Sequence, residues 1–600
     1  MKKYILATLL TAVSMIAFAV PAKREWRTYT QPDGTTIDVM LVGDEFYHFT
    51  VNRDGEQVRL DKDGFYKVAG AAPSRTAIKA RREQSKFRRM RKEVGTKPNL
   101  APRGLVILVN YDDTTFQPAH TKAVFDELCN STACTVNTYN GVKYPSAAQY
   151  FADQSNGAYR PVFDVVGPVT LSKEYDFYGH NIDAEGNPTD ESSNETSDQY
   201  ATDAVIEACI LADKEFNIDF TQYDSDNDGY IDFVYVIYAG RGEADGGGAN
   251  TIWPHNWEAI YTVLPFNEDG QYDPENGERM SCCYTEDDIV FDGVWLNNYA
   301  MSSELSSSGL GGIGTLCHEF GHVMGLPDWY DTDYGTNYAT YRTPNEWDIM
   351  DDGSYNGDGH CPPNYSPWEK YFFGWITPEN LGSNGQALEL TANGTDDYKA
   401  YQVNASGKQQ GATTAGWCYY FENRQKLGWD KFIPTAGMII WKVNFNADAW
   451  TGNVPNNSST SGSPLYTLVC AEGTRVGKYA GGRDVFPYGT TDSWEDVEGK
   501  PLLDITRDGQ VIDLVYIEPE ANPVVTWVVD GEVLTTQTYT VFDPLELPAE
   551  ILPLCDEETE FLGWTTEENW ADPFSDPADL FTTAEGKKVL KSVTYYALFK

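Results

Sequence analysis

The chain has 600 residues, with 44 Lys and Arg against 90 Asp and Glu, a formal net charge of −46, and only seven histidines. This length is too great for one hydrophobic core, so two to four domains are expected. Such an acidic surface repels nucleic acids and anionic membranes, which argues against both as partners, and it suits an extracytoplasmic protein that contains calcium.

The N-terminus has the features of a secretion signal. Lys2 and Lys3 precede a largely apolar run over residues 4–18, and Ala17-Phe18-Ala19 offers small residues for cleavage, so residues 1–19 are predicted to be a signal peptide. The apolar run is short for a membrane span, and no later segment is long enough. We therefore expect a secreted or extracytoplasmic protein without membrane insertion. The residue after the cut is valine, so lipid anchoring has no support.

Residues 20–102 are predicted to form a propeptide. Up to about residue 70, the Asp54-Gly55 and Asp63-Gly64 pairs lie between short alternating apolar runs, which is typical of β-hairpins. Residues 75–97 then carry ten basic and two acidic side chains, as in an exposed linker. This basic linker fits an electrostatic strap on the acidic body, a site cut by a basic-specific protease, or an inert spacer. No cysteine precedes Cys129, so latency through a propeptide thiol is excluded.

The centre of the chain mixes strands and helices, and the remainder is β-rich. The predicted strands before residue 375 are 104–109, 233–238 and 292–299, and the predicted helices are 145–157, 198–216 and one from about residue 312. The strands predicted later include 417–421 and 438–443, with a last linker at 519–523. We expect an α/β (α+β) catalytic domain at 103–378, a β-rich domain at 379–518 and a small β domain at 519–600.

The segment 317–328 carries the strongest chemical signal. His318 and His322 are four residues apart, so on an α-helix both imidazoles project to the same side and supply two ligands of a zinc ion. Glu319 lies beside the metal without binding it, as a general base requires. Gly325 ends the helix and brings back Asp328 as third ligand, which leaves one position open for water, as in a catalytic zinc site. Asp331 is an alternative third ligand.

This segment resembles the extended zinc motif of the metzincin-type peptidases, with an aspartate at the last ligand position. With Leu326-Pro327-Asp328-Trp329-Tyr330-Asp331 it is similar to the M6 peptidases, the immune inhibitor A family of secreted bacterial proteases, and the similarity extends through much of residues 103–445. The resemblance implies a zincin or metzincin-like fold, a zinc cofactor and a methionine turn at residues 347–354. Met350 would then lie beneath the zinc.

Two further residues lie near these motifs. His255, in the sequence Trp253-Pro254-His255, is expected to be structural and not a metal ligand. Tyr355 follows the methionine turn and is a candidate for stabilising the oxyanion, with packing as the alternative.

The segment 224–232 predicts a structural calcium site. Asp224, Asp226, Asp228 and Asp232 occupy positions 1, 3, 5 and 9 of a calcium loop, Gly229 makes the turn, and the Tyr230 carbonyl supplies position 7. Position 12 is a tyrosine, so the loop is not a complete EF-hand, and a simple acidic turn is the alternative.

The tail and the ten cysteines are less informative. Residues 561–566 and 594–599 resemble one copy of the Listeria–Bacteroides repeat of surface proteins, which implies a small domain for spacing or adhesion. Cys129 with Cys134, and Cys282 with Cys283, are possible disulfide partners, but buried free thiols are an equal alternative.

Together these features predict a secreted zinc endopeptidase, made as a zymogen, that hydrolyses peptide bonds in extracellular proteins with Glu319 activating water. The alternatives are an extracellular adhesin or binding protein with an inactive protease-like domain, and a metal-dependent hydrolase of non-peptide bonds. The sequence leaves open the cleavage specificity, the physiological substrate, the maturation site, the disulfide pairing and the oligomeric state.

Overall fold

The computed structural model describes the chain from residue 21 to residue 599, with gaps. The gaps are 24, 44–47, 62, 72–99, 181–197, 266–272, 274, 276, 278, 333–342, 382–385, 458–463, 473–482, 498–500, 517–519, 521, 541–542, 549–560, 569–578, 585–586, 588 and 590. The predicted signal peptide and the basic segment 75–97 therefore lie outside the described residues. Within them, no helix combines the length and the apolar character that a membrane span requires.

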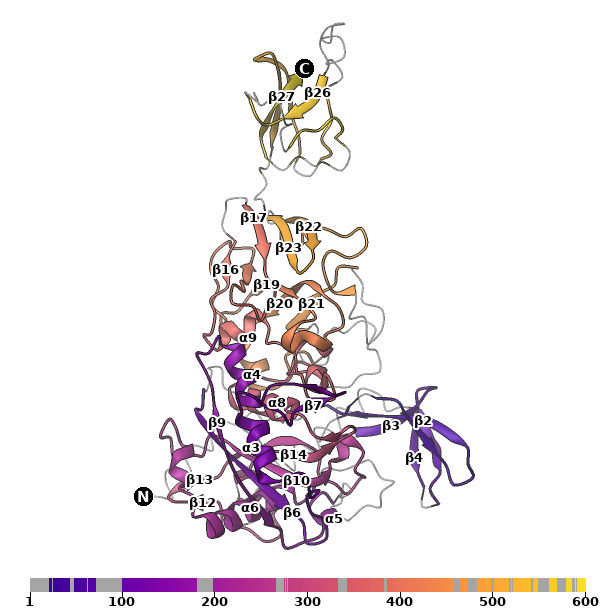
Figure 1. The fold of residues 1–600 in the computed structure, drawn as a ribbon, viewed down its shortest axis with the longest axis vertical. Coiled ribbons are helices and arrows are strands. Elements are labelled where there is room, and N and C mark those ends of the chain that lie inside the picture. The colour runs from indigo at the N-terminus through magenta and orange to yellow at the C-terminus, as the bar shows by residue number, and fades with distance from the viewer. Residues whose placement is uncertain are drawn as a thin grey trace.

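A six-stranded mixed sheet is the centre of the α/β part of the molecule (Figure 1). Its order is β11-β14-β10-β6-β9, with β15 paired to β14; β9, β6, β10 and β14 are parallel, and β11 and β15 are antiparallel to β14. The strands are β6 (Arg103–Asn110), β9 (Val162–Thr170), β10 (Val234–Arg241), β11 (His255–Glu258), β14 (Asn298–Ser306) and β15 (Gly309–Leu310). The near-continuous apolar runs of β6 and β10 match central parallel strands that are buried on both faces.

Helices cover both faces of this sheet. On one face, alternate residues such as Tyr235 and Ile237 pack with α3 (Lys122–Asn130), α4 (Ala147–Gln154) and α8 (Gly314–Val323). On the other, Val234 and Val236 pack with α5 (Tyr175–Tyr178) and α6 (Ala201–Phe216). The shorter elements of this part are β7 (Thr138–Tyr139), β8 (Val142–Lys143), η1 (Phe220–Tyr223), η2 (Glu243–Asp245), α7 (Ile260–Val263), η3 (Asn345–Trp347), η4 (Asp352–Tyr355) and α9 (Pro367–Phe372).

One predicted strand, residues 292–299, is wrong as a single element. Asp292 and Gly293 have φ values of 48° and 91°, and they form a tight turn between β12 (Val290–Phe291) and β13 (Val294–Trp295). An Asp-Gly pair favours this turn because glycine, and to a lesser extent aspartate, tolerates positive φ. The long strand, β14, begins only at residue 298.

The N-terminal residues form a separate antiparallel sheet that lies to one side of the α/β part (Figure 1). Its five strands follow each other in sequence order: β1 (Arg27–Thr30), β2 (Thr36–Gly43), β3 (His48–Asn52), β4 (Glu56–Leu60) and β5 (Tyr66–Ala71). Gly55 and Gly64, at φ values of 76° and 81°, make the two predicted hairpin turns.

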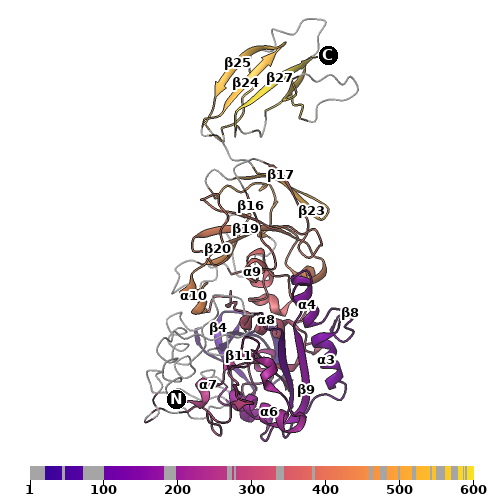
Figure 2. The same cartoon turned by 90° about the vertical axis from the view of Figure 1, so that its left-hand side faces the viewer.

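A β-rich region follows the α/β part along the long axis of the molecule, and a last β unit lies beyond it (Figure 2). The first sheet contains β16 (Glu379–Asn380), β18 (Tyr401–Val403), β19 (Trp417–Arg424), β20 (Gly437–Asn444) and β21 (Tyr466–Val469), with η5 (Gly428–Phe432) and α10 (Ala447–Thr451) between strands. The second contains β17 (Gln386–Leu390), β22 (Leu502–Asp508) and β23 (Val511–Tyr516). The last unit contains β24 (Val524–Val529), β25 (Glu532–Thr538), β26 (Phe561–Thr565) and β27 (Val593–Phe599).

The predicted domain boundary at residue 378 does not separate two hydrophobic cores. One buried cluster contains Phe320 and Val323 of α8 together with Trp441, Trp450 and Tyr466 of the β-rich region. The α/β part and the first β-rich sheet therefore stabilise each other, whereas the last unit has a cluster of its own around Trp527 and Trp564.

Candidate metal centre

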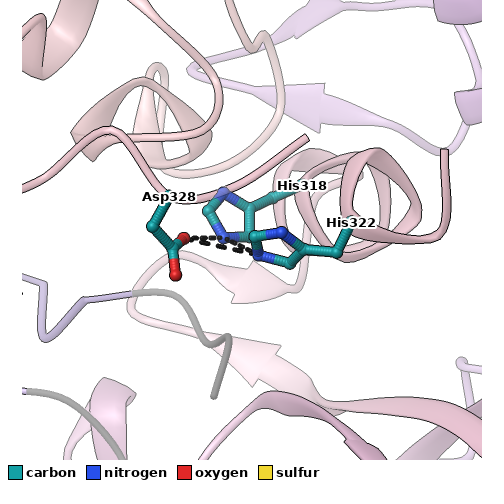
Figure 3. Close-up of side chains that lie close together, drawn as sticks. All are labelled: His318, His322 and Asp328. Atoms are coloured by element: carbon teal, nitrogen blue, oxygen red, sulfur yellow. Dashed lines mark hydrogen bonds and ion pairs between the residues drawn. The ribbon is translucent and has the colours of Figure 1, made fainter. Parts of the chain in front are cut away.

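Two histidines project from one side of α8 toward the loop that follows it (Figure 3). His318 and His322 are both buried, and their Nε2 atoms lie 3.1 Å apart. The helix ends at Val323; Gly325 then adopts a φ of 102°, which only glycine accepts at little cost, and the Leu326 N–H bonds back to the Gly321 carbonyl. The predicted turn after Gly325 is thus present.

This turn returns Asp328 to the two imidazoles, as Figure 3 shows. Asp328 Oδ1 lies 3.3 Å from Nε2 of both His318 and His322. A tetrahedral ion about 2.0–2.1 Å from each ligand requires neighbouring ligand atoms to lie about 3.3 Å apart. Three ligand atoms separated by 3.1–3.3 Å therefore match the edges of a zinc tetrahedron. The buried Oδ1 atom also accepts no hydrogen bond from any described residue, as expected of an atom that faces a cation.

Hydrogen bonds at the far side of each ring fix the imidazoles in the ligand form. His318 Nδ1 donates to the Ile349 carbonyl at 2.7 Å, and His322 Nδ1 donates to the Leu326 carbonyl at 2.8 Å. The proton on Nδ1 leaves the Nε2 lone pair for a metal. Burial lowers the pKa of His322 to about 4, so this ring is neutral at neutral pH.

Glu319 and Met350 are both buried at the helix that carries the two histidines. Glu319 is fully buried on α8, next to His318. Burial raises the pKa of Tyr235, a hydrogen bond with Ser302 opposes this rise, and the charge of Glu319 adds to it. Met350 is fully buried against the helix at Gly321, where an added Cβ would come within 2.6 Å of its Sδ atom. The methionine therefore packs directly beneath the turn of α8 that carries the two histidines.

Other predicted residues lie outside the metal cluster. Asp331 is buried but does not join the group of ligand atoms, so Asp328 is the carboxylate that the fold brings to the histidines. His255 Nδ1 donates to the Trp253 carbonyl at 2.6 Å, and its Nε2 lies 3.2 Å from the Tyr299 hydroxyl, in keeping with a structural role. The Tyr355 hydroxyl donates to the carbonyl of Pro21 at 2.8 Å.

The predicted calcium loop is only partly assembled. Carboxylate oxygens of Asp224, Asp226 and Asp228 lie within 4.8 Å of one another. Asp232 instead accepts hydrogen bonds from Ser225, at 2.8 Å from N–H and 2.5 Å from Oγ, so its Oδ2 atom is directed to the loop and not to the other carboxylates. The Tyr230 N–H donates to Asp228 Oδ1 at 2.8 Å.

The described cysteines form no disulfide bonds. All nine of them, including Cys129, Cys134, Cys282 and Cys283, are free. The alternative of unpaired thiols therefore describes this structure.

Sequence reasoning missed two buried carboxyl groups, Asp348 and Glu369, that contact the segments around Asp328 and Met350. Asp348 lies beside Glu369, and burial is the main cause that raises the pKa of both carboxyl groups, that of Glu369 to about 7. Asp348 Oδ1 accepts from the Met350 N–H, and Glu369 Oε1 accepts from Trp329 Nε1, each at 2.9 Å. This carboxyl pair thus connects the methionine turn to the residue that follows Asp328. Nothing in local spacing identifies it, because the partners are separated in sequence.

Comparison with known proteins assigns this part of the chain. Residues 105–377 match the family model described as immune inhibitor A peptidase M6, catalytic domain. Pre-pro-metalloprotease PrtV of Vibrio cholerae serotype O1 is 28% identical over 270 residues, which cover 41% of this chain and 26% of the relative. Immune inhibitor A of Bacillus thuringiensis subsp. alesti is 28% identical over 254 residues, or 39% of this chain and 32% of the relative.

The chain therefore spans about a quarter to a third of the length of these curated relatives. The matched range contains α8, the loop to Asp328 and the methionine turn, which are the elements that bring the candidate ligands together. Residues 105–377 are therefore similar to the catalytic domain of the M6 peptidase family.

Proposed function

We propose that this protein is a secreted zinc-dependent endopeptidase that hydrolyses peptide bonds in extracellular proteins. The observation that carries the proposal is the spacing of 3.1–3.3 Å among two imidazole nitrogens and one carboxylate oxygen, all buried. This donor set suits zinc, and three protein ligands leave a fourth position for water or substrate.

His318, His322 and Asp328 would hold the ion, and Glu319 would perform the proton transfers. Zinc, when bound, supplies a Lewis acid that polarises the scissile carbonyl and lowers the pKa of water. Glu319, adjacent to His318 on α8, accepts the proton of the attacking water and returns it to the leaving amine. Met350 packs against the helix turn between the two histidines.

A zymogen is the proposed form of the full chain. Support comes from the name of the Vibrio relative, a pre-pro-metalloprotease, and from the way the N-terminal sheet contacts the α/β part. Lys23 forms an ion pair with Asp358, and His48 Nε2 lies 2.9 Å from Glu243 Oε1. Val42, Phe49 and Val51 pack on Tyr330, two residues after the third ligand. We propose that residues 20–102 restrict access to the metal centre until they are removed.

A calcium ion at Asp224, Asp226 and Asp228 is proposed as a structural cofactor. The support is the short separation of the three carboxylates and the sharp turn at Gly229, whose φ is 91°. Bound calcium would neutralise the mutual repulsion of these groups. The last β unit stays a predicted spacing or adhesion module.

A casein zymogram with and without a zinc chelator tests the proposal. The full chain is treated with trypsin, and Glu319→Ala serves as the matched variant that keeps all three ligands. We expect activity that trypsin raises, that the chelator removes and that the variant lacks. A chain that binds zinc but cleaves no protein substrate after trypsin treatment would favour an adhesin with an inactive protease-like domain.

A further inference from the structure

One asparagine from the β-rich region holds the third metal ligand. Asn453 Nδ2 donates to Asp328 Oδ2 at 2.7 Å, and Asn453 Oδ1 accepts from the Asp328 backbone N–H at 2.6 Å. Both residues are fully buried. The two bonds join the main chain and the side chain of the same residue, so together they fix the rotation of the carboxylate.

The two hydrogen bonds with Asn453 leave the two carboxylate oxygens of Asp328 in different environments. Oδ2 is bonded to Asn453, whereas Oδ1 accepts no hydrogen bond from a described residue and lies 3.3 Å from each imidazole Nε2. With Oδ2 occupied, the carboxylate presents a single oxygen to an ion between the imidazoles.

The segment that carries Asn453 is itself held rigidly. The Asn453 N–H donates to the Trp450 carbonyl at 3.0 Å, and Trp450 packs on Trp329 with ring centroids 5.4 Å apart. Asn456 Nδ2 donates to the carbonyls of Trp329 and Tyr466, both at 2.6 Å. The loop after Asp328 is therefore bound at successive residues by one segment of the β-rich region.

We propose that Asn453 is a positioning residue for Asp328, and that it makes this aspartate a ligand through one oxygen. The inference rests on the proposed zinc site and extends it, because Asn453 lies beyond residues 105–377, which match the catalytic domain. The metal centre is then completed by the β-rich region, and residues 105–377 alone lack a part that the third ligand needs.

Zinc affinity of the full chain, measured by competition with a fluorescent zinc chelator, tests this role. Asn453→Gly removes the side-chain amide without straining the backbone, because Asn453 has a φ of 45° and glycine adopts positive φ readily. We expect zinc to bind roughly 10–100-fold more weakly, as is typical when a group that orients a metal ligand is lost. Asn453→Ser, whose shorter side chain does not reach Oδ2, should behave alike and decides the test if the glycine variant does not fold.

The matched control is Asn423→Ala. Asn423 is also fully buried, and its Nδ2 donates to the carbonyls of Leu390 and Gln510 at 2.8 and 2.7 Å, away from the metal ligands. This variant loses comparable hydrogen bonds, so it should lower the stability of the fold but leave zinc affinity within about threefold, since it touches no ligand.

A spectroscopic measurement separates positioning from general stability. Cobalt(II) replaces zinc, and its visible absorption weakens when coordination rises above four. Release of Oδ2 in Asn453→Gly allows both oxygens of Asp328 to bind, so this variant should show a weaker visible band, whereas Asn423→Ala should match the parent. Equal affinity and equal spectra for the two variants would overturn the role of Asn453. Failure of the parent chain to bind zinc would instead overturn the proposed function.

Discussion

The contact between Gly321 and Met350 leads to a prediction about why α8 has a glycine between its two histidines. An alanine Cβ at position 321 would lie 2.6 Å from Met350 Sδ and 3.3 Å from its Cε atom. Favourable contact requires about 3.5–4.0 Å, so the methionine side chain must retreat by about 1 Å. Its backbone cannot follow, because its N–H bonds to Asp348 and its carbonyl accepts from Trp329.

Two opposing energies determine the outcome of Gly321→Ala. Alanine in a helix interior is favoured over glycine by about 1 kcal/mol. Forcing an extra methyl into a packed core costs about 1–3 kcal/mol. We therefore expect Gly321→Ala to lower the free energy of unfolding of the parent chain by roughly 0–2 kcal/mol. Zinc binding should also weaken, because Met350 supports the turn that carries both histidines.

A double-mutant cycle isolates the contact. Met350→Ala should cost about 2–5 kcal/mol through the cavity it leaves. In that background the clash is absent, so Gly321→Ala should stabilise by about 1 kcal/mol. Urea denaturation of the metal-free full chain, followed by tryptophan fluorescence, measures both effects, since Trp329 and Trp347 are buried near the site. An equal gain in stability from Gly321→Ala in both backgrounds would refute the reasoning.

Two further predictions concern carboxyl groups. Glu319→Gln should bind zinc with nearly unchanged affinity but reduce kcat by about 10²–10⁴-fold, because a general base typically accelerates the reaction by that factor. Isothermal titration with zinc and the kinetics of cleavage of one peptide substrate measure the two quantities. A large loss of zinc affinity would contradict the role of Glu319 as a base that does not bind the metal. The second concerns the Asp348 and Glu369 pair. The folded-state pKa of Glu369 is raised from 4.5 to about 7, so its contribution to stability is complete below pH 4.5 and about 3 kcal/mol is lost as the pH rises through 7. Burial also raises the pKa of Asp348, so Asp348→Asn, which cannot ionise, should show a smaller fall in urea midpoint between pH 5 and pH 8 than the parent. If the urea midpoints of Asp348→Asn and the parent chain fell equally with pH, the pKa of Asp348 would be the same in the folded and unfolded states, and the prediction would be wrong.

The local features of the metal site follow from the sequence alone. The four-residue spacing of His318 and His322 fixes their common side on any α-helix, and the glycine at 325 determines where that helix turns back. The Asp-Gly pairs of the N-terminal sheet specify their hairpins in the same way. These features depend only on backbone preferences over a few residues, so they can be predicted before the fold is known.

The tertiary structure decided the features that depend on distant segments. It selected Asp328 over Asp331 as the carboxylate beside the imidazoles. It also brought Asn453 to Asp328 across 125 residues of sequence. The reason is physical: the direction of a buried polar side chain is set by the partner that satisfies its hydrogen bonds, and only packing of the whole chain determines which partner lies within reach.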